Sequence, residues 1–264
     1  MAFILIIAHF RSQENSMLKE ERYEKILKIL DNENYISSHE LAGRLFVSMP
    51  TIRRDLAYLE KKKQIVRSHG GARKINDEYM VMPLAFRENV NHAEKRMLCE
   101  AANKLIKDDS IVFLDGSTTV LPLAELISTK QNITVITNSI PVSVLLAKKG
   151  IRTYSTCGEL LENSMAYVGS FAEDFVRKFN IDICFFSSLG IDKNGTIVDN
   201  SLPETLLRNV VLSQSAKSVF LCDKTKFNVT APYNLMAIQD ADIIITNCNN
   251  SCLLKDYKGK IITT

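Results

Sequence analysis

The sequence predicts an α/β protein in two parts, a small and mainly helical N-terminal domain followed by a larger C-terminal domain. Short amphipathic segments and a basic, glycine-containing segment occupy residues 17–75, and beyond residue 90 short apolar runs alternate with amphipathic stretches. Apolar strands between helices are typical of a mainly parallel sheet covered on both faces. A chain of 264 residues is long enough for both parts.

Charge is unevenly distributed along the chain. Residues 17–75 contain 13 Lys and Arg against 8 Asp and Glu, a net charge of +5, whereas residues 76–264 carry a net charge of −2. A basic domain joined to a mildly acidic remainder indicates that the first part binds nucleic acid. The four segments expected are a disordered or mis-assigned extension (1–16), a DNA-binding domain (17–75), a linker (76–90) and a larger C-terminal domain (91–264).

The first sixteen residues contain a short apolar run, Phe3 to Ala8, that is too short to span a membrane and lacks a basic flank. We expect translation to begin at Met17 or this extension to be disordered. No other segment resembles a targeting or membrane-spanning element, so a cytoplasmic protein without a membrane partner is predicted. The six cysteines form no CxxC pair. Reduced, buried thiols are therefore expected, with no metal site and no cofactor.

Three helices are predicted in the N-terminal domain. Apolar residues give 18–31 one helical face, and Tyr35-Ile36 follows as a short extended piece. Ser37 or Ser38 is expected to cap a second helix over 40–46. Ser48 is expected to cap a third helix that runs to about Lys61, since Pro50 is tolerated in a first helical turn.

The third helix has the pattern of a DNA reader. Ile52, Leu56 and Leu59 form its core stripe, and Arg54 lies nearly opposite. A hairpin with its turn at Gly70-Gly71 is expected over 64–75, which completes a winged helix-turn-helix. Isolated charge runs usually form solvated faces, but three helices before a basic hairpin favour DNA binding. The predicted DNA-contacting residues are Ser48, Thr51, Arg53, Arg54, Arg67, His69 and Arg73.

Strands and helices alternate through the C-terminal domain after a helix at 92–107. Strands are expected at 111–114, 133–137, 151–155, 181–187, 219–222 and 243–246, separated by amphipathic stretches near 119–128, 140–149, 165–179 and 203–214. In such sheets, ligands bind at the carboxyl ends of the strands.

The first strand ends in a Gly/Ser/Thr turn, Asp115-Gly116-Ser117-Thr118-Thr119. Free amides and hydroxyls at a helix start suit a phosphate group, and the lack of a lysine in the turn excludes a nucleotide P-loop. A generic helix cap is the alternative. Other strand ends carry polar groups at 137–139, 157–159, 190–192 and 223–227. If these converge, they form a pocket for a small phosphorylated polyol, with Lys226 adding positive charge.

Several motifs resemble the DeoR family of bacterial transcription regulators. In the N-terminal domain they are Glu40-Leu41-Ala42, Val47-Ser48, Thr51 to Leu56 and His69 to Ala72, with Gln64 as a departure where the family more often has glycine. In the C-terminal domain they include Val168 to Ala172, Asp182, Gly190-Ile191-Asp192 and Lys226-Phe227. The resemblance implies a winged helix-turn-helix followed by an effector domain similar in fold to ribose-phosphate isomerase.

Carried over by position, the resemblance implies that Asp115, Gly116, Ser117, Thr118 and Thr119 face a sugar phosphate. It also implies that Asn138, Gly158, Asp192, Glu204 and Lys226 line the rest of the pocket. Departures occur in the order Gly116-Ser117, in Cys157-Gly158, in Ser187 to Gly190, and at Arg208, where lysine is common.

The predicted function is a repressor of a sugar-catabolism operon, whose affinity for double-stranded operator DNA is modulated by a phosphorylated sugar. A homodimer or homotetramer is expected, because one small domain makes few DNA contacts. The alternative is an active sugar-phosphate isomerase or deaminase with a DNA-binding domain, for which Asp115, Asp192, Glu204 and Lys226 supply the residue types. In the main prediction the protein is not an enzyme. An activator in place of a repressor, or a regulator linked to nucleosides in place of sugars, remains an open alternative.

Overall fold

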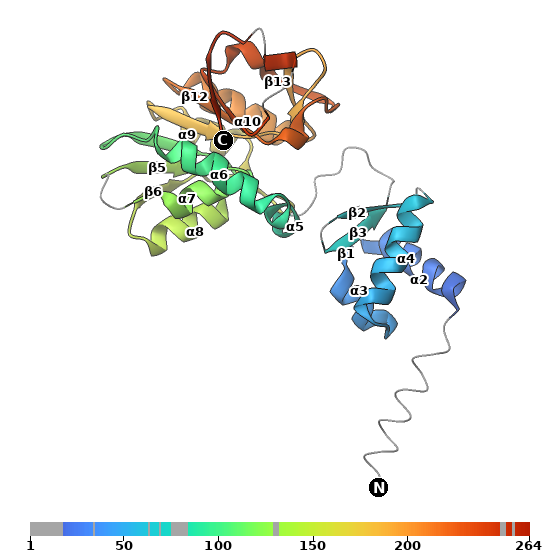
Figure 1. Ribbon diagram of the computed structural model, residues 1–264. Helices are drawn as coiled ribbons and strands as arrows, with labels where there is room; N and C mark the ends of the chain where they lie inside the picture. Colours follow the sequence, from blue (N-terminus) through green and yellow to red (C-terminus); the bar gives the residue numbers. More distant parts are fainter. Residues whose placement is uncertain are drawn as a thin grey trace. The chain divides into compact units, whose positions relative to one another are not determined.

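The computed structural model describes residues 18–33, 35–62, 64–68, 70–74, 84–128, 132–248, 252–254 and 257–264. The chain divides into two compact units, Met1–Glu78 and Tyr79–Thr264, which we call the N-terminal and C-terminal domains (Figure 1). His69 and residues 1–16 of the predictions lie outside the described residues.

The N-terminal domain contains the three predicted helices and the hairpin. Ser37 and Ser48 cap the second and third helices, as predicted, by accepting hydrogen bonds from the amides of Glu40 and Thr51. The strands form an antiparallel sheet in the order β1-β3-β2. Its elements are α2 (Lys19–Glu33), β1 (Tyr35–Ser37), α3 (Ser38–Leu45), α4 (Met49–Lys61), β2 (Ile65–Ser68) and β3 (Gly71–Lys74).

The core of this domain includes the predicted stripe of α4, since Ile52, Leu56 and Leu59 are all buried. Asp55 lies on the same face and is also buried, which the sequence analysis did not anticipate. Its carboxylate accepts two hydrogen bonds from Arg22 of α2, from Nε at 2.5 Å and from Nη2 at 2.9 Å. This ion pair joins the first and third helices inside the core.

The C-terminal domain is built on seven parallel strands in the order β15-β14-β12-β9-β4-β5-β6. Every neighbouring pair in this sheet is parallel, as the apolar runs predicted. The edge strand β15 was not predicted. The strands are β4 (Ile111–Leu114), β5 (Thr134–Thr137), β6 (Arg152–Ser155), β9 (Ile183–Phe186), β12 (Ser218–Cys222), β14 (Ile243–Thr246) and β15 (Lys260–Thr263).

Helices cover both faces of the sheet (Figure 1). Successive side chains of β4 point to opposite faces of the sheet, so Val112 and Leu114 belong to one core cluster and Phe113 belongs to the other. The first cluster includes residues of α6 (His92–Asn103), α7 (Leu121–Leu126) and α8 (Ile140–Lys148). The second includes residues of α9 (Ser170–Val176) and α10 (Leu202–Ser213).

Two small sheets add to this frame. An antiparallel sheet in the order β10-β11-β13 contains Gly190–Ile191, Thr196–Asp199 and Tyr233–Ala237, and a hairpin pairs β7 (Glu159–Leu161) with β8 (Ala166–Val168). Three short 3-10 helices, η2 (Lys224–Lys226), η3 (Ile238–Asp240) and η4 (Cys252–Leu254), complete the described elements. None of the small strands has enough apolar length to stand out in the sequence.

Two expectations need correction. Residues 84–89, placed in a linker, form a short helix, α5 (Leu84–Asn89), with Leu84 buried. The stretch lacks a full amphipathic period because six residues complete fewer than two turns. The helix after the Gly/Ser/Thr turn starts only at Leu121, so Asp115 to Val120 form a loop. Among the described residues, no helix is long and apolar enough to cross a membrane.

Candidate functional site

The order of the strands reverses between β4 and β9, since β5 and β6 lie on one side of β4 and the later strands follow on the other. Crevices at such reversal points are where parallel sheets bind ligands. Two loops leave the carboxyl ends of these neighbouring strands, Asp115 to Val120 and Ser187 to Leu189. The buried carboxylate of Asp115 joins them by accepting hydrogen bonds from the amides of Ser117 at 3.0 Å and Ser187 at 3.3 Å.

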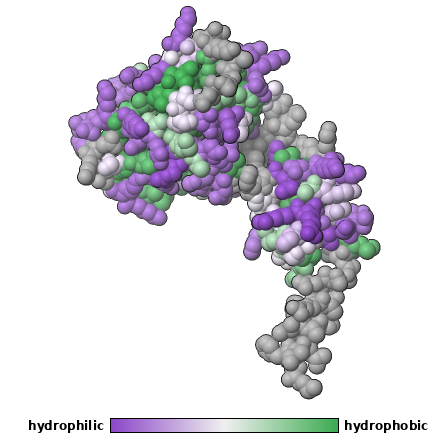
Figure 2. Space-filling view, in the orientation of Figure 1, coloured by the Kyte–Doolittle hydropathy of each residue, from purple (hydrophilic) through white to green (hydrophobic). Residues whose placement is uncertain are grey.

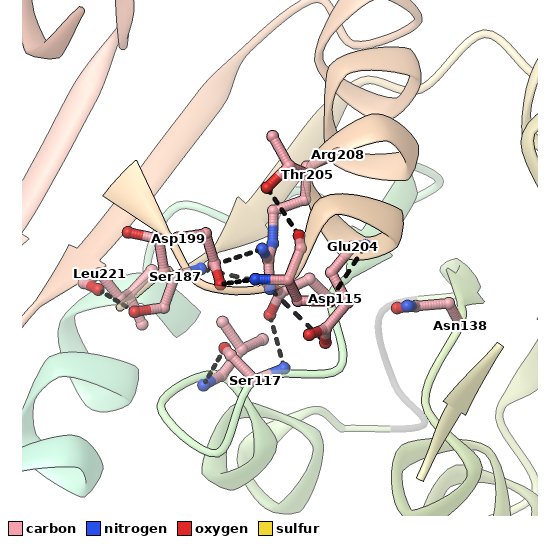
Figure 3. Close-up of polar contacts among 12 residues, drawn as sticks. Asp115, Ser117, Asn138, Ser187, Asp199, Glu204, Thr205, Arg208 and Leu221 are labelled. Carbon is pink, nitrogen blue, oxygen red and sulfur yellow. Dashed lines mark hydrogen bonds and ion pairs between the residues drawn. The ribbon is translucent and has the colours of Figure 1, made fainter. Parts of the chain in front are cut away.

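Behind these loops, Arg208 of α10 is surrounded by carboxylates (Figure 3). Its Nε lies 3.1 Å from Asp115, its Nη1 lies 2.7 Å from Asp199, and its Nη2 lies 3.8 Å from Glu204. Burial alone lowers the pKa of a guanidinium, but the three carboxylates outweigh it and raise the pKa of Arg208 above its ordinary value. Asp115 therefore positions the two loops, and its carboxylate oxygens already accept hydrogen bonds from the amides of the loops and from Arg208.

Two lysines flank the loops from the other side. Lys95 of α6 is buried and donates to Thr118 Oγ1 at 3.0 Å and to the carbonyl of Arg87 at 2.5 Å. Lys226 is half-buried and donates to Ser187 Oγ at 2.9 Å and to the carbonyl of Ser188 at 2.5 Å. All these acceptors are neutral oxygens. Among the described residues, neither lysine forms an ion pair.

The electrostatics of the two lysines follow from this lack of anions. Burial and, to a smaller extent, the charge of Lys226 lower the pKa of Lys95 from 10.5 to about 8, against the opposite effect of Asp223. Burial also lowers the pKa of Lys226, again opposed by Asp223. The charge of Lys226 thus disfavours the ammonium form of Lys95, and the charge of Arg87 disfavours the ammonium form of both lysines, which a bound anion would reverse.

The loop between them offers amides to such an anion. The backbone N–H groups of Gly116, Thr118 and Thr119 donate no hydrogen bond to any described residue. Gly116 is required by packing, since a Cβ there would lie 2.8 Å from that of Ala166. Lys95 contacts this loop and Lys226 contacts the adjoining loop of Ser187 to Leu189. Free amides, hydroxyls and two ammonium groups at the two loops are a donor set suited to a phosphate group.

Beyond the loop, polar atoms without partners surround the carboxyl ends of β5 and β6. Asn138 Oδ1, Thr156 Oγ1 and Ser164 Oγ are buried without a hydrogen-bond partner among the described residues. Figure 3 shows the Asn138 side chain standing apart from the Arg208 cluster, with no contact drawn to it. Ser164 and Glu204 also line a cavity of about 440 Å³ between the β7–β8 hairpin and the start of α10. Buried polar groups without partners are costly unless a ligand or water satisfies them.

The structure brings together most of the predicted effector-binding residues. The first loop contains Asp115 to Thr119, and the second accepts a hydrogen bond from Lys226. Glu204 lies beside Arg208, and Asn138 follows directly after the adjacent strand β5. The carboxylate of Asp192 is engaged within its own turn, where it accepts hydrogen bonds from the amides of Asn194 and Thr196, and these bonds lower its pKa. Gly158 (φ 126°) packs against the carbonyl of Val168, where a Cβ would lie 2.3 Å away.

Sequence reasoning missed several residues of the site, and Lys95 is the most important of them. It lies three residues before Leu98 and four before Cys99, both buried, so it shares the apolar face of α6. A lysine at that spacing was a usable signal. Arg208 was noted only as a departure from a family pattern, and its partner Asp199 was not noted at all.

The predicted DNA-contacting residues lie mainly on the exposed side of α4 and on the hairpin. Arg53, Arg54 and Arg67 are exposed, whereas Thr51 and Arg73 are half-buried. Hydrophilic residues occupy much of the visible surface of this domain (Figure 2). The Ser48 hydroxyl is engaged as the cap of α4 and lies 2.9 Å from Thr51 Oγ1. Glu60 lies 3.7 Å from Arg67, so this arginine is partly neutralised.

Comparison with known families gives two adjoining matches. The DeoR-like helix-turn-helix domain matches residues 22–78, and the DeoR C terminal sensor domain matches residues 90–248. The chain belongs to the DeoR family. It is therefore a DNA-binding transcriptional regulator, and the family predicted from its motifs is confirmed.

Curated relatives match the sequence of this DeoR-family chain over most of their length. An uncharacterized HTH-type transcriptional regulator of Bacillus subtilis is 32% identical over 88% of this chain and 90% of its own. The lactose phosphotransferase system repressor of Staphylococcus aureus is 34% identical over 80% of this chain and 84% of its own. Ribose 5-phosphate isomerase A from Methanocaldococcus jannaschii matches 52% of this chain and 55% of its own, with 15% identity and a TM-score of 0.40.

Proposed function

We propose that this DeoR-family regulator represses a sugar-catabolism operon and that a phosphorylated sugar, bound in the C-terminal domain, modulates its affinity for the operator. The observation that carries the proposal is the pair of lysines, Lys95 and Lys226, which among the described residues donate only to neutral oxygens. The loop that Lys95 contacts also has three amides without a partner in this part of the chain. Burying two like charges is unfavourable unless an anion joins them. The relative from Staphylococcus aureus is named as a repressor of a lactose phosphotransferase system.

Polar groups at the strand ends and in the cavity support a sugar as the rest of the ligand. Asn138, Thr156 and Ser164 supply buried polar atoms that have no partner among the described residues and suit the hydroxyl groups of a polyol. Ser164 and Glu204 line the 440 Å³ cavity, where the carboxylate of Glu204 favours hydroxyl donors over a second anion. We therefore assign the phosphate to the loop of Gly116 to Thr119 and the hydroxyls to the cavity.

A catalytic role is not supported by the carboxylates. An isomerase needs a carboxylate base next to the substrate carbon. Asp115 and Asp199 are held by the buried guanidinium of Arg208, and Glu204 lies within 3.8 Å of it. Each of these carboxylates is therefore engaged by Arg208. We propose that the chain is not an enzyme, and NMR spectra of pentose and hexose phosphates incubated with it should show no isomer formation.

On the DNA side, we propose that α4 lies in the major groove, with Arg53 and Arg54 contacting bases or phosphates and the hairpin touching the backbone. Two or more copies, a homodimer or homotetramer assembled through the C-terminal domain, would place several N-terminal domains on one operator. We propose a cytoplasmic location, where operator DNA and phosphorylated sugars are both present.

A thermal-shift screen tests the ligand class. The full chain is mixed with fructose 6-phosphate, glucose 6-phosphate, ribose 5-phosphate, the matching unphosphorylated sugars and inorganic phosphate. A sugar phosphate at a hundredfold excess over its Kd should stabilise the protein by about 2.7 kcal/mol. The free sugars should have little effect. Equal stabilisation by free and phosphorylated sugars, or none by either, contradicts the proposal.

A further inference from the structure

We propose that Lys95 couples the ligand site to helix α5, so that a bound phosphate group locks α5 onto the C-terminal domain. The inference rests on the proposed function, because it needs an anion beside Lys95. Helix α5 is the first described element after the N-terminal domain, and residues 75–83 join it to β3. Whatever fixes α5 therefore fixes the point at which the DNA-binding domain is attached.

Arg87 ties α5 to the rest of the C-terminal domain. Its side chain donates to the carbonyl of Asn163 at 3.4 Å. Its carbonyl accepts a hydrogen bond from the Lys95 ammonium at 2.5 Å. Leu84, at the start of the helix, is buried. A helix of six residues is not stable in isolation, so its order depends on such contacts.

The same ammonium group touches the phosphate loop. Lys95 donates to Thr118 Oγ1 at 3.0 Å. Thr118 belongs to the loop in which the amides of Gly116, Thr118 and Thr119 have no partner among the described residues. An ammonium group has three donors. Two are used by Arg87 and Thr118, and the third has no acceptor among the described residues. A phosphate oxygen completes this set, so ligand and α5 do not compete for the same donor.

The direction of the effect follows from the charge. Burial lowers the pKa of Lys95 to about 8, so the ammonium form still predominates at neutral pH but is less stable than in water. A phosphate group accepts a charge-assisted hydrogen bond from this ammonium, and such bonds are about twice as strong as neutral ones. The ammonium is then held in place beside Thr118 and the Arg87 carbonyl. Its contact with Arg87 is therefore fixed on binding, and α5 becomes more ordered.

Hydrogen–deuterium exchange of the full chain tests the inference. Exchange of the amides of residues 85–95 is measured alone, with saturating inorganic phosphate, and with saturating fructose 6-phosphate. We expect α5 to exchange at least about fivefold more slowly with either probe, the lower end of typical coupling between sites. Faster exchange means that the ligand releases α5, and unchanged exchange in a protein that the probe stabilises means no coupling. Either result overturns the inference alone.

Three variants separate Lys95 from general charge effects. In Lys226→Met, phosphate binds more weakly, but saturating phosphate should still slow α5. In Lys95→Met, α5 should exchange rapidly with and without phosphate. Lys149→Met is the matched control, because Lys149 donates to backbone carbonyls at the end of α7 and lies outside the site. It should behave as the parent chain in α5. If saturating phosphate fails to slow exchange of α5 equally in Lys226→Met and Lys95→Met, the assignment to Lys95 is overturned. If the parent chain binds no phosphate at all, the proposed function fails as well.

Discussion

The two domains bury charge in opposite ways. In the N-terminal domain, Arg22 and Asp55 form a closed pair, in which each buried charge meets its opposite at 2.5 to 2.9 Å. In the described part of the C-terminal domain, Lys95 and Lys226 donate only to neutral oxygens, at or beside the loops that follow β4 and β9. The first arrangement is complete without any other molecule. The second gains stability only when an anion arrives.

The difference teaches how to separate a structural charge from a binding charge in one chain. Hydrogen bonding to Asp55 raises the pKa of Arg22 despite burial, whereas burial lowers the pKa of Lys95. A raised pKa in a cation indicates compensation inside the fold, and a lowered pKa indicates missing compensation. Arg208, within the same domain as the lysines, follows the first pattern and acts as the support of the site.

The largest expected effect comes from opening the closed pair. Asp55→Ala leaves Arg22 charged and buried, and removing one partner of such a pair costs about 3–5 kcal/mol. Chemical denaturation followed by circular dichroism should show an N-terminal domain that unfolds early, with operator binding lost. The double variant Arg22→Met/Asp55→Leu is the control and should recover most of the stability. A single variant as stable as the parent chain would show that the pair is not structural.

Removing a buried charge that has no opposite charge beside it should raise the free energy of unfolding instead of lowering it. Lys95→Met keeps the volume of the side chain and removes a charge whose pKa is lowered from 10.5 to about 8. The C-terminal domain without ligand should gain on the order of 2 kcal/mol, because one pKa unit corresponds to about 1.4 kcal/mol and two hydrogen bonds are lost. The variant should also lose its stabilisation by sugar phosphates. Destabilisation together with retained ligand binding would place Lys95 among the structural charges.

Exposed charges on the N-terminal domain form a third class, without effect on folding. Arg54→Ala should weaken operator binding by about 1–3 kcal/mol per DNA-binding domain, the typical size of a bidentate base contact. Stability should stay within about 0.5 kcal/mol of the parent chain. Lys28→Ala, on the exposed side of α2, removes the same charge and is the control. Equal losses in both variants, measured by fluorescence anisotropy at one salt concentration, would reduce Arg54 to a general electrostatic role.

The smallest expected effect is a pH dependence. Between pH 8 and 10.5, folded Lys95 loses its proton while the unfolded chain keeps it. The unfolded state then binds more protons, so the free energy of unfolding rises with pH, by about 1 kcal/mol between pH 8 and 9. The measurement is the difference between the parent chain and Lys95→Met, which cancels other titrating groups. Saturating phosphate should abolish the difference, and a difference that is unchanged by phosphate would separate Lys95 from the ligand.

Local patterns predicted most of the elements and part of the site. Caps such as Ser37 and Ser48, the stripe of α4 and the apolar run of β4 depend on neighbours within a few residues, and all appear as expected. The short strands of the two small sheets and helix α5 were missed, because two to six residues hold too little of any period. Asp115 was expected at the ligand, but its oxygens hold the loops and Arg208.

The sequence by itself determined that a basic winged helix-turn-helix precedes a parallel α/β domain, and that the first strand of this domain ends in a loop suited to phosphate. Only the tertiary structure decided which buried charges are compensated. Arg22 and Asp55 lie 33 residues apart, and Arg208 and Asp115 lie 93 apart. Helical and strand periods are set by adjacent residues, whereas the partner of a charge is set by which distant elements pack together. For this reason buried cations stabilise the fold at Arg22 and Arg208, whereas at Lys95 and Lys226 they are available to bind an anionic ligand.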